Sequence, residues 1–162
     1  MINFTSDFNS QKSKFKLIGK NILKRWIHSV VNERDRKVGE ITCIFMDDKN
    51  ILELNRSSLN HNYYTDIITF DFSQDVPDGK IYADLYISID TVLANSETYK
   101  QPYTNKLESE LCRVIIHGIL HLLGENDLSE SEQKKMRNAE NKALELLRND
   151  FATNSIRCSY QK

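Results

Sequence analysis

Residues 111–128 read LCRVIIHGILHLLGENDL, a stretch that places polar side chains inside an otherwise apolar run. His117 and His121 are four residues apart, and on an α-helix this spacing stacks two side chains on one face, one turn apart. Gly124 follows where a helix would end on a left-handed residue, so the chain would turn back and bring Asp127 toward the histidines. The pattern H-x-x-x-H-x-x-G-x-x-D therefore predicts three protein ligands, the usual number for a catalytic zinc with one open position.

The same spacing is close to the metzincin protease motif H-E-x-x-H-x-x-G-x-x-H, with two differences. The third ligand is Asp127 rather than histidine, and a carboxylate oxygen is an acceptable zinc ligand. Gly118 stands where such a peptidase has its general-base glutamate, and glycine cannot accept a proton. The motif thus predicts a metal site that lacks the proteolytic base at its expected position.

A purely structural interpretation of this stretch also exists, because two histidines on a helix can be polar residues of a core. The glycine and the carboxylate at the right offsets favour the metal instead. Gly118 costs roughly 1 kcal/mol relative to alanine inside a helix. We expect this cost to reflect the close approach of a substrate or of another part of the backbone.

The segment HGILHLLG at 117–124 resembles the HGxLHLxG core of the YbeY family, metal-dependent endoribonucleases of ribosomal RNA maturation. Further matches are LN at 54–55 with TDIITF at 65–70, ADLYIS at 83–88, and Met136 with Glu140 in the following helix. The resemblance spans roughly residues 40 to 147, which is most of the chain.

This resemblance implies an α+β fold: a single domain with a small mixed β-sheet, surrounding helices and a central metal-binding helix, similar to the zincins. It implies a zinc-dependent, single-strand-specific endoribonuclease that acts in ribosomal RNA maturation and ribosome quality control. One Zn²⁺ per chain is expected at His117, His121 and Asp127, with another divalent metal as the alternative. The implied partners are ribosomal RNA and the small ribosomal subunit with its associated proteins.

One departure from the family concerns an arginine in the loop between LN and TD. Counting back from Thr65 places this arginine at Leu59, so the chain lacks it. Arg56 and His61 lie within three residues and are the candidates to supply positive charge or proton transfer. His61 is equally compatible with a surface loop histidine.

Two other functions remain open at this point. A zinc metallopeptidase would need a carboxylate elsewhere within reach of the metal, because Gly118 cannot serve as the base. A non-catalytic, ribosome-associated RNA-binding factor would hold a structural metal, with a fourth protein ligand closing its coordination.

The first 38 residues are basic, with nine Lys or Arg against three acidic residues, although the whole chain has a net charge of −1. Apolar residues recur at helical spacing and predict an amphipathic basic helix from about 11 to 33. Lys12, Lys16, Lys20 and Lys24 are therefore candidates for phosphate contacts. The alternative is a solvated helix face.

The remaining elements follow from periodicity, caps and turn residues. Strands are expected at 40–46, 66–72 and 81–88, the last two as a hairpin, with a polar loop at 56–65. Helices are expected after Asp47 or Asp48, after Ser88 or Asp90, at about 104–123, and at about 129–148 behind a capping box at Ser129. Residues 1–149 would form the domain, and residues 150–162 a polar, frayed tail.

The composition of the 162 residues is ordinary for one globular domain, with 40% hydrophobic and 28% charged residues. No apolar run approaches the roughly 20 residues that a membrane helix needs, and the N-terminus has no signal-peptide core. Cys43, Cys112 and Cys158 are an odd, widely spaced set, which argues against a disulfide framework. We expect a reduced, cytoplasmic protein without membrane contact.

Overall fold

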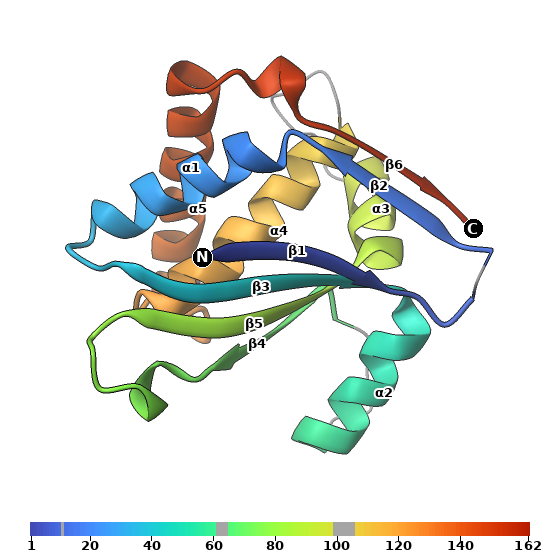
Figure 1. Cartoon of the computed structure of the whole chain (residues 1–162), viewed down its shortest axis with the longest axis horizontal. Coiled ribbons are helices and arrows are strands. Elements are labelled where there is room, and N and C mark those ends of the chain that lie inside the picture. The colour runs from blue at the N-terminus through green and yellow to red at the C-terminus, as the bar shows by residue number, and fades with distance from the viewer. Residues whose placement is uncertain (11, 61–64, 99–105) are drawn as a thin grey trace.

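Four strands form the main sheet of the computed structural model, in the order β1-β3-β5-β4 (Figure 1). Their bounds are Ile2–Asp7 for β1, Val38–Met46 for β3, Ile67–Asp71 for β4 and Ile81–Ser88 for β5. The strands β1, β3 and β5 run parallel, and β4 pairs antiparallel with β5. The structure describes residues 1–10, 12–60, 65–98 and 106–162. The mixed sheet and its three predicted strands are confirmed.

Helices cover both faces of this sheet. In Figure 1, α1 (Lys20–Asn32), α3 (Ile89–Thr98), α4 (Lys106–Leu122) and α5 (Glu130–Asp150) lie above the sheet, and α2 (Asp48–Leu59) lies below it. The helix α4 packs against α1, α3, α5, β4 and β5, and its residues Ile115, Ile116 and Ile119 have no exposed surface. The predicted central helix is therefore confirmed, in a single α+β domain.

The helix caps explain where α2 and α5 begin. The Asp47 side chain accepts a hydrogen bond from the Asn50 N–H at 2.9 Å, which satisfies one of the free donors of the first turn of α2. Ser129 and Glu132 form the predicted capping box at the start of α5. The helix α2 continues to Leu59, so the predicted loop at 56–65 is wrong for residues 56–59, and 61–64 lie outside the described residues.

The N-terminal basic segment differs from the prediction of one helix over 11–33. Residues Lys14–Ile18 form the strand β2, and α1 begins only at Lys20, after Gly19 with φ +89°. A Cβ atom at Gly19 would lie 2.6 Å from the Ser155 carbonyl oxygen, so both the conformation and the close approach require glycine. The apolar residues that fit one helical repeat thus belong to a strand, a turn and a helix.

The predicted frayed tail is also wrong for its last residues. A 3-10 turn at Thr153–Ser155 leads into β6 (Arg157–Gln161), which pairs antiparallel with β2. The Tyr160 hydroxyl donates a hydrogen bond to Asp90 at 2.9 Å, and its ring stacks on Phe8. This second, two-stranded sheet joins the two ends of the chain beside the helical layer (Figure 1).

The three cysteines and the lengths of the helices bear on the predicted absence of disulfides and of membrane helices. Cys43 and Cys112 are buried, Cys158 is half-buried, and all three are free thiols. Among the described helices, none combines the length and the apolar character that a membrane crossing requires.

Candidate metal centre

Two histidines on the last two turns of α4 form the base of the candidate site. The spacing of four residues places their rings against each other, and the two Nε2 atoms are 3.0 Å apart. Both side chains are partly buried, with His121 the more exposed. The apolar remainder of the helix turn packs into the core and holds this face in place.

A tight turn after α4 returns the chain to the histidines. Gly124 has φ +99°, its N–H donates to the His121 carbonyl oxygen at 3.0 Å, and the Glu125 N–H donates to the Leu120 carbonyl oxygen at 3.0 Å. These two bonds form a Schellman motif, the helix ending that the sequence predicts at this glycine. An ion pair of 3.1 Å between Glu125 and Arg34 ties the turn to the segment after α1.

Asp127 arrives at the histidines on the far side of this turn. Its Oδ2 atom lies 3.3 Å from His117 Nε2 and 3.4 Å from His121 Nε2. For ligand bonds of about 2.0–2.1 Å, two ligands of a tetrahedral zinc are about 3.3 Å apart. The three donor atoms therefore have the spacing of one face of a zinc coordination sphere, and they are the group among the described residues that could hold a metal ion.

The outer nitrogen of each histidine has its own acceptor. The Nδ1–H of His117 donates to Glu140 Oε2 at 2.9 Å, and the Nδ1–H of His121 donates to the Glu125 carbonyl oxygen at 2.9 Å. With these protons on Nδ1, both Nε2 lone pairs face each other and the Asp127 oxygen. In this tautomer the two nitrogens and the carboxylate oxygen direct lone pairs toward one point, and this donor set fits a divalent cation.

A charged network behind His117 holds Glu140 in place. Arg113 bridges Glu140 Oε1 at 3.1 Å and Glu110 Oε1 at 2.6 Å, and lies 3.6 Å from Asp66. Burial opposes the charge on Glu140, but its bonds to His117 and Arg113 outweigh burial and lower the pKa of Glu140. The network therefore keeps this carboxylate ionised as the acceptor for His117.

Burial also opposes protonation of His117, yet the Glu140 hydrogen bond and the charges of Glu140, Asp66 and Asp127 raise the pKa of His117. Negative charge thus gathers around this imidazole. The same field favours any cation placed at its Nε2 atom.

The residues of this supporting network were not among the predicted site residues. Arg113 precedes His117 by four residues and so continues the stripe of the two histidines along α4, which is a signal that was available. Glu140 belongs to the family resemblance, but only the structure shows that it contacts His117. Asp66 and Glu110 carried no distinguishing local pattern.

Gly118 has a packing role in the structure. A Cβ atom there would lie 2.7 Å from Ile67 Cδ1, 3.2 Å from Leu85 Cδ2 and 3.3 Å from Thr69 Oγ1. The glycine therefore lets α4 lie close against β4 and β5. The structure differs from the expectation of a substrate or another part of the backbone at this position, because the groups nearest to Gly118 are side chains of the sheet.

The other predicted site residues lie on different elements. Arg56 is exposed in the last turn of α2, which packs mainly against β4, β5 and α3. Leu59, at the position of the family arginine, is 42% exposed. His61 lies outside the described residues. The structure thus brings together the three candidate metal ligands, and the roles of Arg56 and His61 stay predictions.

The four candidate lysines are divided between two elements. Lys12 and Lys16 lie before and on β2, whereas Lys20 and Lys24 lie in the first turns of α1. The metal turn meets the other end of α1 through Arg34. The 13 residues of α1 span about 20 Å, so Lys20 lies at the end of α1 that is distant from the metal turn.

Comparison with known proteins adds three findings. Residues 5–148 match the family described as Endoribonuclease YbeY. A protein of that name from Phocaeicola vulgatus is 47% identical over 140 residues, which are 86% of this chain and 96% of the relative. Another from Porphyromonas gingivalis is 44% identical over 143 residues, covering 88% and 89% of the two chains.

The solution structure of TM1509 from Thermotoga maritima is similar over 93% of both chains, with a TM-score of 0.57 and 24% sequence identity. This likeness shows a shared fold and confirms the predicted architecture.

Proposed function

The chain belongs to the YbeY family, and from this premise we propose that it is a zinc-dependent endoribonuclease that cuts single-stranded ribosomal RNA during ribosome maturation. The observation that carries the proposal is the meeting of His117 Nε2, His121 Nε2 and Asp127 Oδ2 within 3.0–3.4 Å. Three such ligands leave one coordination position for water or substrate.

Zinc is the proposed metal because imidazole nitrogens and one carboxylate oxygen at this spacing are typical zinc ligands. When bound, such an ion acts as a Lewis acid and lowers the pKa of coordinated water to about 7. The chain's own contribution is orientation. Glu140 and the Glu125 carbonyl fix the two imidazoles with Nε2 inward, and Asp127 completes the set.

Several features favour RNA over a peptide as the substrate. Position 118 is packed against β4 and β5, so a peptidase base has no room there. A peptidase would need another carboxylate as its base, but the nearby ones already have partners. Glu140 bonds to His117 and Arg113, and Asp66 lies beside Arg113. A phosphodiester is also anionic before it reacts, so the ion at the three ligands would attract it, whereas a peptide bond is neutral.

We propose that Arg56 and His61 assist catalysis from the segment after α2, where the family arginine is replaced by Leu59. General acid–base help is typically worth about 10²–10⁴-fold, so His61→Ala should lower RNA cleavage at least about tenfold. Unchanged cleavage in both His61→Ala and Arg56→Ala would remove these residues from the mechanism.

Lys12, Lys16, Lys20 and Lys24 are the proposed phosphate contacts distant from the metal. Replacing all four with glutamine should weaken RNA binding and flatten its salt dependence by roughly one unit of log–log slope per lost contact. An unchanged slope would leave them as solvated side chains. The proposed setting is the cytoplasm, with the small ribosomal subunit as the partner that presents the RNA.

The test compares single-stranded ribosomal RNA fragments with casein as substrates, each with and without a chelator. We expect RNA cleavage that stops with the chelator and returns with Zn²⁺, and intact casein throughout. His28→Ala is the matched control for His121→Ala, because His28 lies on α1 outside the site. Chelator-sensitive casein cleavage with intact RNA would overturn the proposal in favour of a metallopeptidase. Metal-loaded protein inactive on both substrates would indicate a non-catalytic RNA-binding factor.

A further inference from the structure

The two-stranded sheet of β2 and β6 has two faces of opposite character. On the inner face, Phe15 lies opposite Tyr160, and both pack against the core together with Leu17. Alternate residues of a strand point to opposite sides, so the positions between these form a second face, the outer ribbon face. It consists of six exposed residues: Lys14, Lys16, Ile18, Arg157, Ser159 and Gln161. This face therefore carries three cations, with no acidic and no aromatic side chain among its six members.

The strand geometry groups the cations differently from the helix that the sequence predicts. A helix would bring together lysines four residues apart, whereas the strand β2 places Lys14 and Lys16 on one face, about 6.8 Å apart. Lys16 lies opposite Ser159, so Arg157 is its diagonal neighbour across the pair, at about 7–8 Å. The structure thus adds a cation from the other end of the chain to those of the N-terminal segment.

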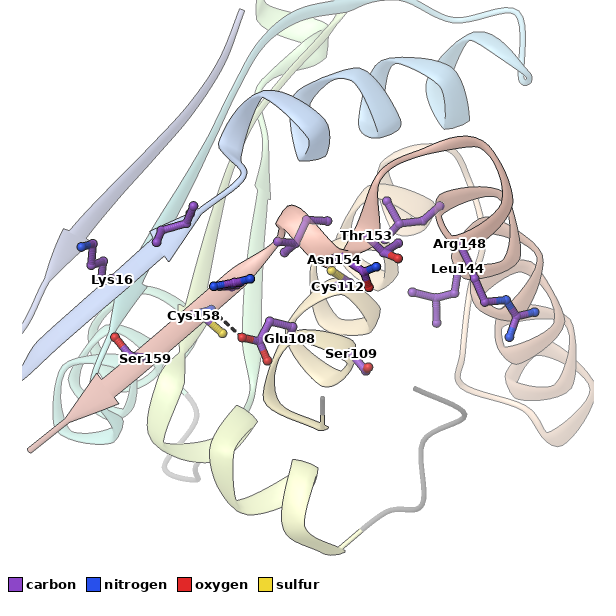
Figure 2. A pocket seen from close by; sticks show the side chains of 14 residues that line it. Lys16, Glu108, Ser109, Cys112, Leu144, Arg148, Thr153, Asn154, Cys158 and Ser159 are labelled. Carbon is purple, nitrogen blue, oxygen red and sulfur yellow. Dashed lines mark hydrogen bonds between the residues drawn. The ribbon is translucent and has the colours of Figure 1, made fainter. Parts of the chain in front are cut away.

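The inner side of the ribbon is fastened to the helices by acidic residues. The Cys158 N–H donates to Glu108 of α4 at 2.6 Å, and the Tyr160 hydroxyl donates to Asp90 of α3 at 2.9 Å. In Figure 2, Cys158 turns toward Glu108, whereas Lys16 points away from it. These two carboxylates are therefore engaged on the inner side, and the ribbon presents its cations from a fixed position.

A cavity of about 1030 Å³ adjoins the ribbon, between the two strands, α4 and the end of α5 (Figure 2). Ser159 lines it from β6, and Thr153 and Asn154 line it from the turn before this strand. Hydroxyl and amide groups both donate and accept hydrogen bonds. Neutral polar groups thus continue the outer ribbon face beyond the three cations.

We propose that the outer ribbon face binds the sugar–phosphate backbone of a double-stranded segment of RNA. Its cations suit phosphates, and the Ser159 hydroxyl and the Gln161 amide suit 2′-hydroxyl groups. Proteins hold single strands by stacking bases on aromatic side chains, and the aromatic residues of this ribbon lie on the inner face. Double-stranded RNA is instead recognised mainly through phosphates and 2′-hydroxyls, which matches the groups on the outer face.

This surface is separate from the candidate metal centre. The strand β6 meets α4 at Glu108, nine residues or about 13.5 Å along the helix before His117. Arg157 also lies beyond residues 5–148, the part of the chain that matches the family. The inference rests on the proposed function, because a ribosomal RNA substrate would bring a duplex beside the single strand that is cut.

The test measures the affinity of the zinc-loaded full chain for an RNA duplex of about twelve base pairs over a range of salt concentrations. The double variant Lys14→Gln, Arg157→Gln should weaken binding at least tenfold at low salt. It should also reduce the log–log salt slope by about two, one unit per lost phosphate contact. The control Lys49→Gln, Lys142→Gln removes the same charge from exposed positions of α2 and α5 and should bind as the parent does.

Two comparisons identify the partner. Titrations with the duplex and with one of its strands, both with a chelator present to stop cleavage, should show the larger loss on the duplex in the variant Lys14→Gln, Arg157→Gln. An equal loss on the single strand would overturn the assignment to a duplex. Vesicles of phosphatidylglycerol that bind as tightly as the duplex, and lose binding in the same variant, would assign the face to a membrane surface instead.

A measurement on the parent chain removes any dependence on how the variants fold. Amide chemical shifts of residues 14–18 and 157–161 should change when the duplex is added, and Arg157→Lys should retain most of the affinity. An unchanged salt slope in the double variant, or shift changes confined to residues 117–127, would overturn the proposal. Cleavage of short single-stranded fragments tests the proposed function by itself, so the failure of one proposal is distinguishable from the failure of the other.

Discussion

The two ends of α4 use polar side chains in different ways. At the C-terminal end, the Nε2 atoms of His117 and His121 and the Oδ2 atom of Asp127 lie 3.0–3.4 Å apart, a spacing that fits one divalent cation. Near the N-terminal end, the buried Glu108 carboxylate accepts a hydrogen bond from the Cys158 N–H at 2.6 Å and so joins α4 to β6. The comparison shows that side chains which converge on one point indicate a ligand site, whereas a carboxylate bound to a backbone N–H supports the fold.

The largest expected effect is that of removing one imidazole from the candidate metal centre. His121→Ala should reduce the metal content from about one ion per chain to near zero. Since the metal contributes several kcal/mol of transition-state stabilisation and each 1.4 kcal/mol is tenfold, RNA cleavage should fall at least about 100-fold. Elemental analysis of protein purified without chelators, beside the kinetics, measures both. Full metal occupancy in His121→Ala, with His28→Ala as the control, would break the account of this end of α4.

Substitutions at Asp127 show whether this residue binds the metal or only forms the turn. Asp127→Ala should weaken metal binding because one of three ligands is lost, whereas Asp127→His should retain the metal because imidazole is a normal zinc ligand. Competition with a chromogenic chelator gives both affinities. Equal affinity in Asp127→Ala and the parent would assign Asp127 to the turn alone.

Glu140 tests the network behind the ligands. Glu140→Gln keeps the shape but loses the charge that accepts from His117 and pairs with Arg113, so metal affinity should fall about 10–100-fold. Glu145→Gln, on the same helix and exposed, is the matched control. The same chelator competition applies, and parent-like affinity in Glu140→Gln would show that the imidazole needs no carboxylate support.

Gly118, between the two ends, carries the smallest expected effect. Gly118→Ala gains about 1 kcal/mol of helix propensity, but overpacking against Ile67 typically costs about 1–3 kcal/mol. We expect the free energy of unfolding in urea to fall by about 1 kcal/mol, with metal content unchanged. Asn138→Ala on the exposed face of α5 reports the propensity gain alone. A more stable Gly118→Ala would contradict the packing role.

The grouping of His117, His121 and Asp127 could be predicted from the sequence because the three residues lie within eleven positions and obey helix periodicity and glycine turn chemistry. The supporting residues could not be predicted in the same way, since Glu140 reaches His117 from another helix, 23 residues later. The pairing of distant strands has no local signal either. The strand β2 pairs with β6 at the other end of the chain, so the residues of β2 were predicted as part of a helix and those of β6 as a tail.

Within the N-terminal segment, one residue did signal the break. Gly19 interrupts the basic stretch, and the side chains of β2 alternate between exposed and covered positions, with Leu17 buried. The same apolar residues also fit a helical repeat with α1, and the sequence period alone does not separate the two. The cavity beside Glu108 combines residues from α4, α5, β2 and β6, so only the folded chain reveals it.

X-ray absorption spectroscopy of the zinc-loaded chain tests the metal centre most directly, because it measures the atoms bound to the ion. The account predicts a first shell of nitrogen and oxygen only, at about 2.0–2.1 Å, with the multiple-scattering signature of two imidazoles that falls to one in His121→Ala. Sulfur at about 2.3 Å, or a spectrum unchanged in His121→Ala, would place the zinc elsewhere and contradict the site at His117, His121 and Asp127.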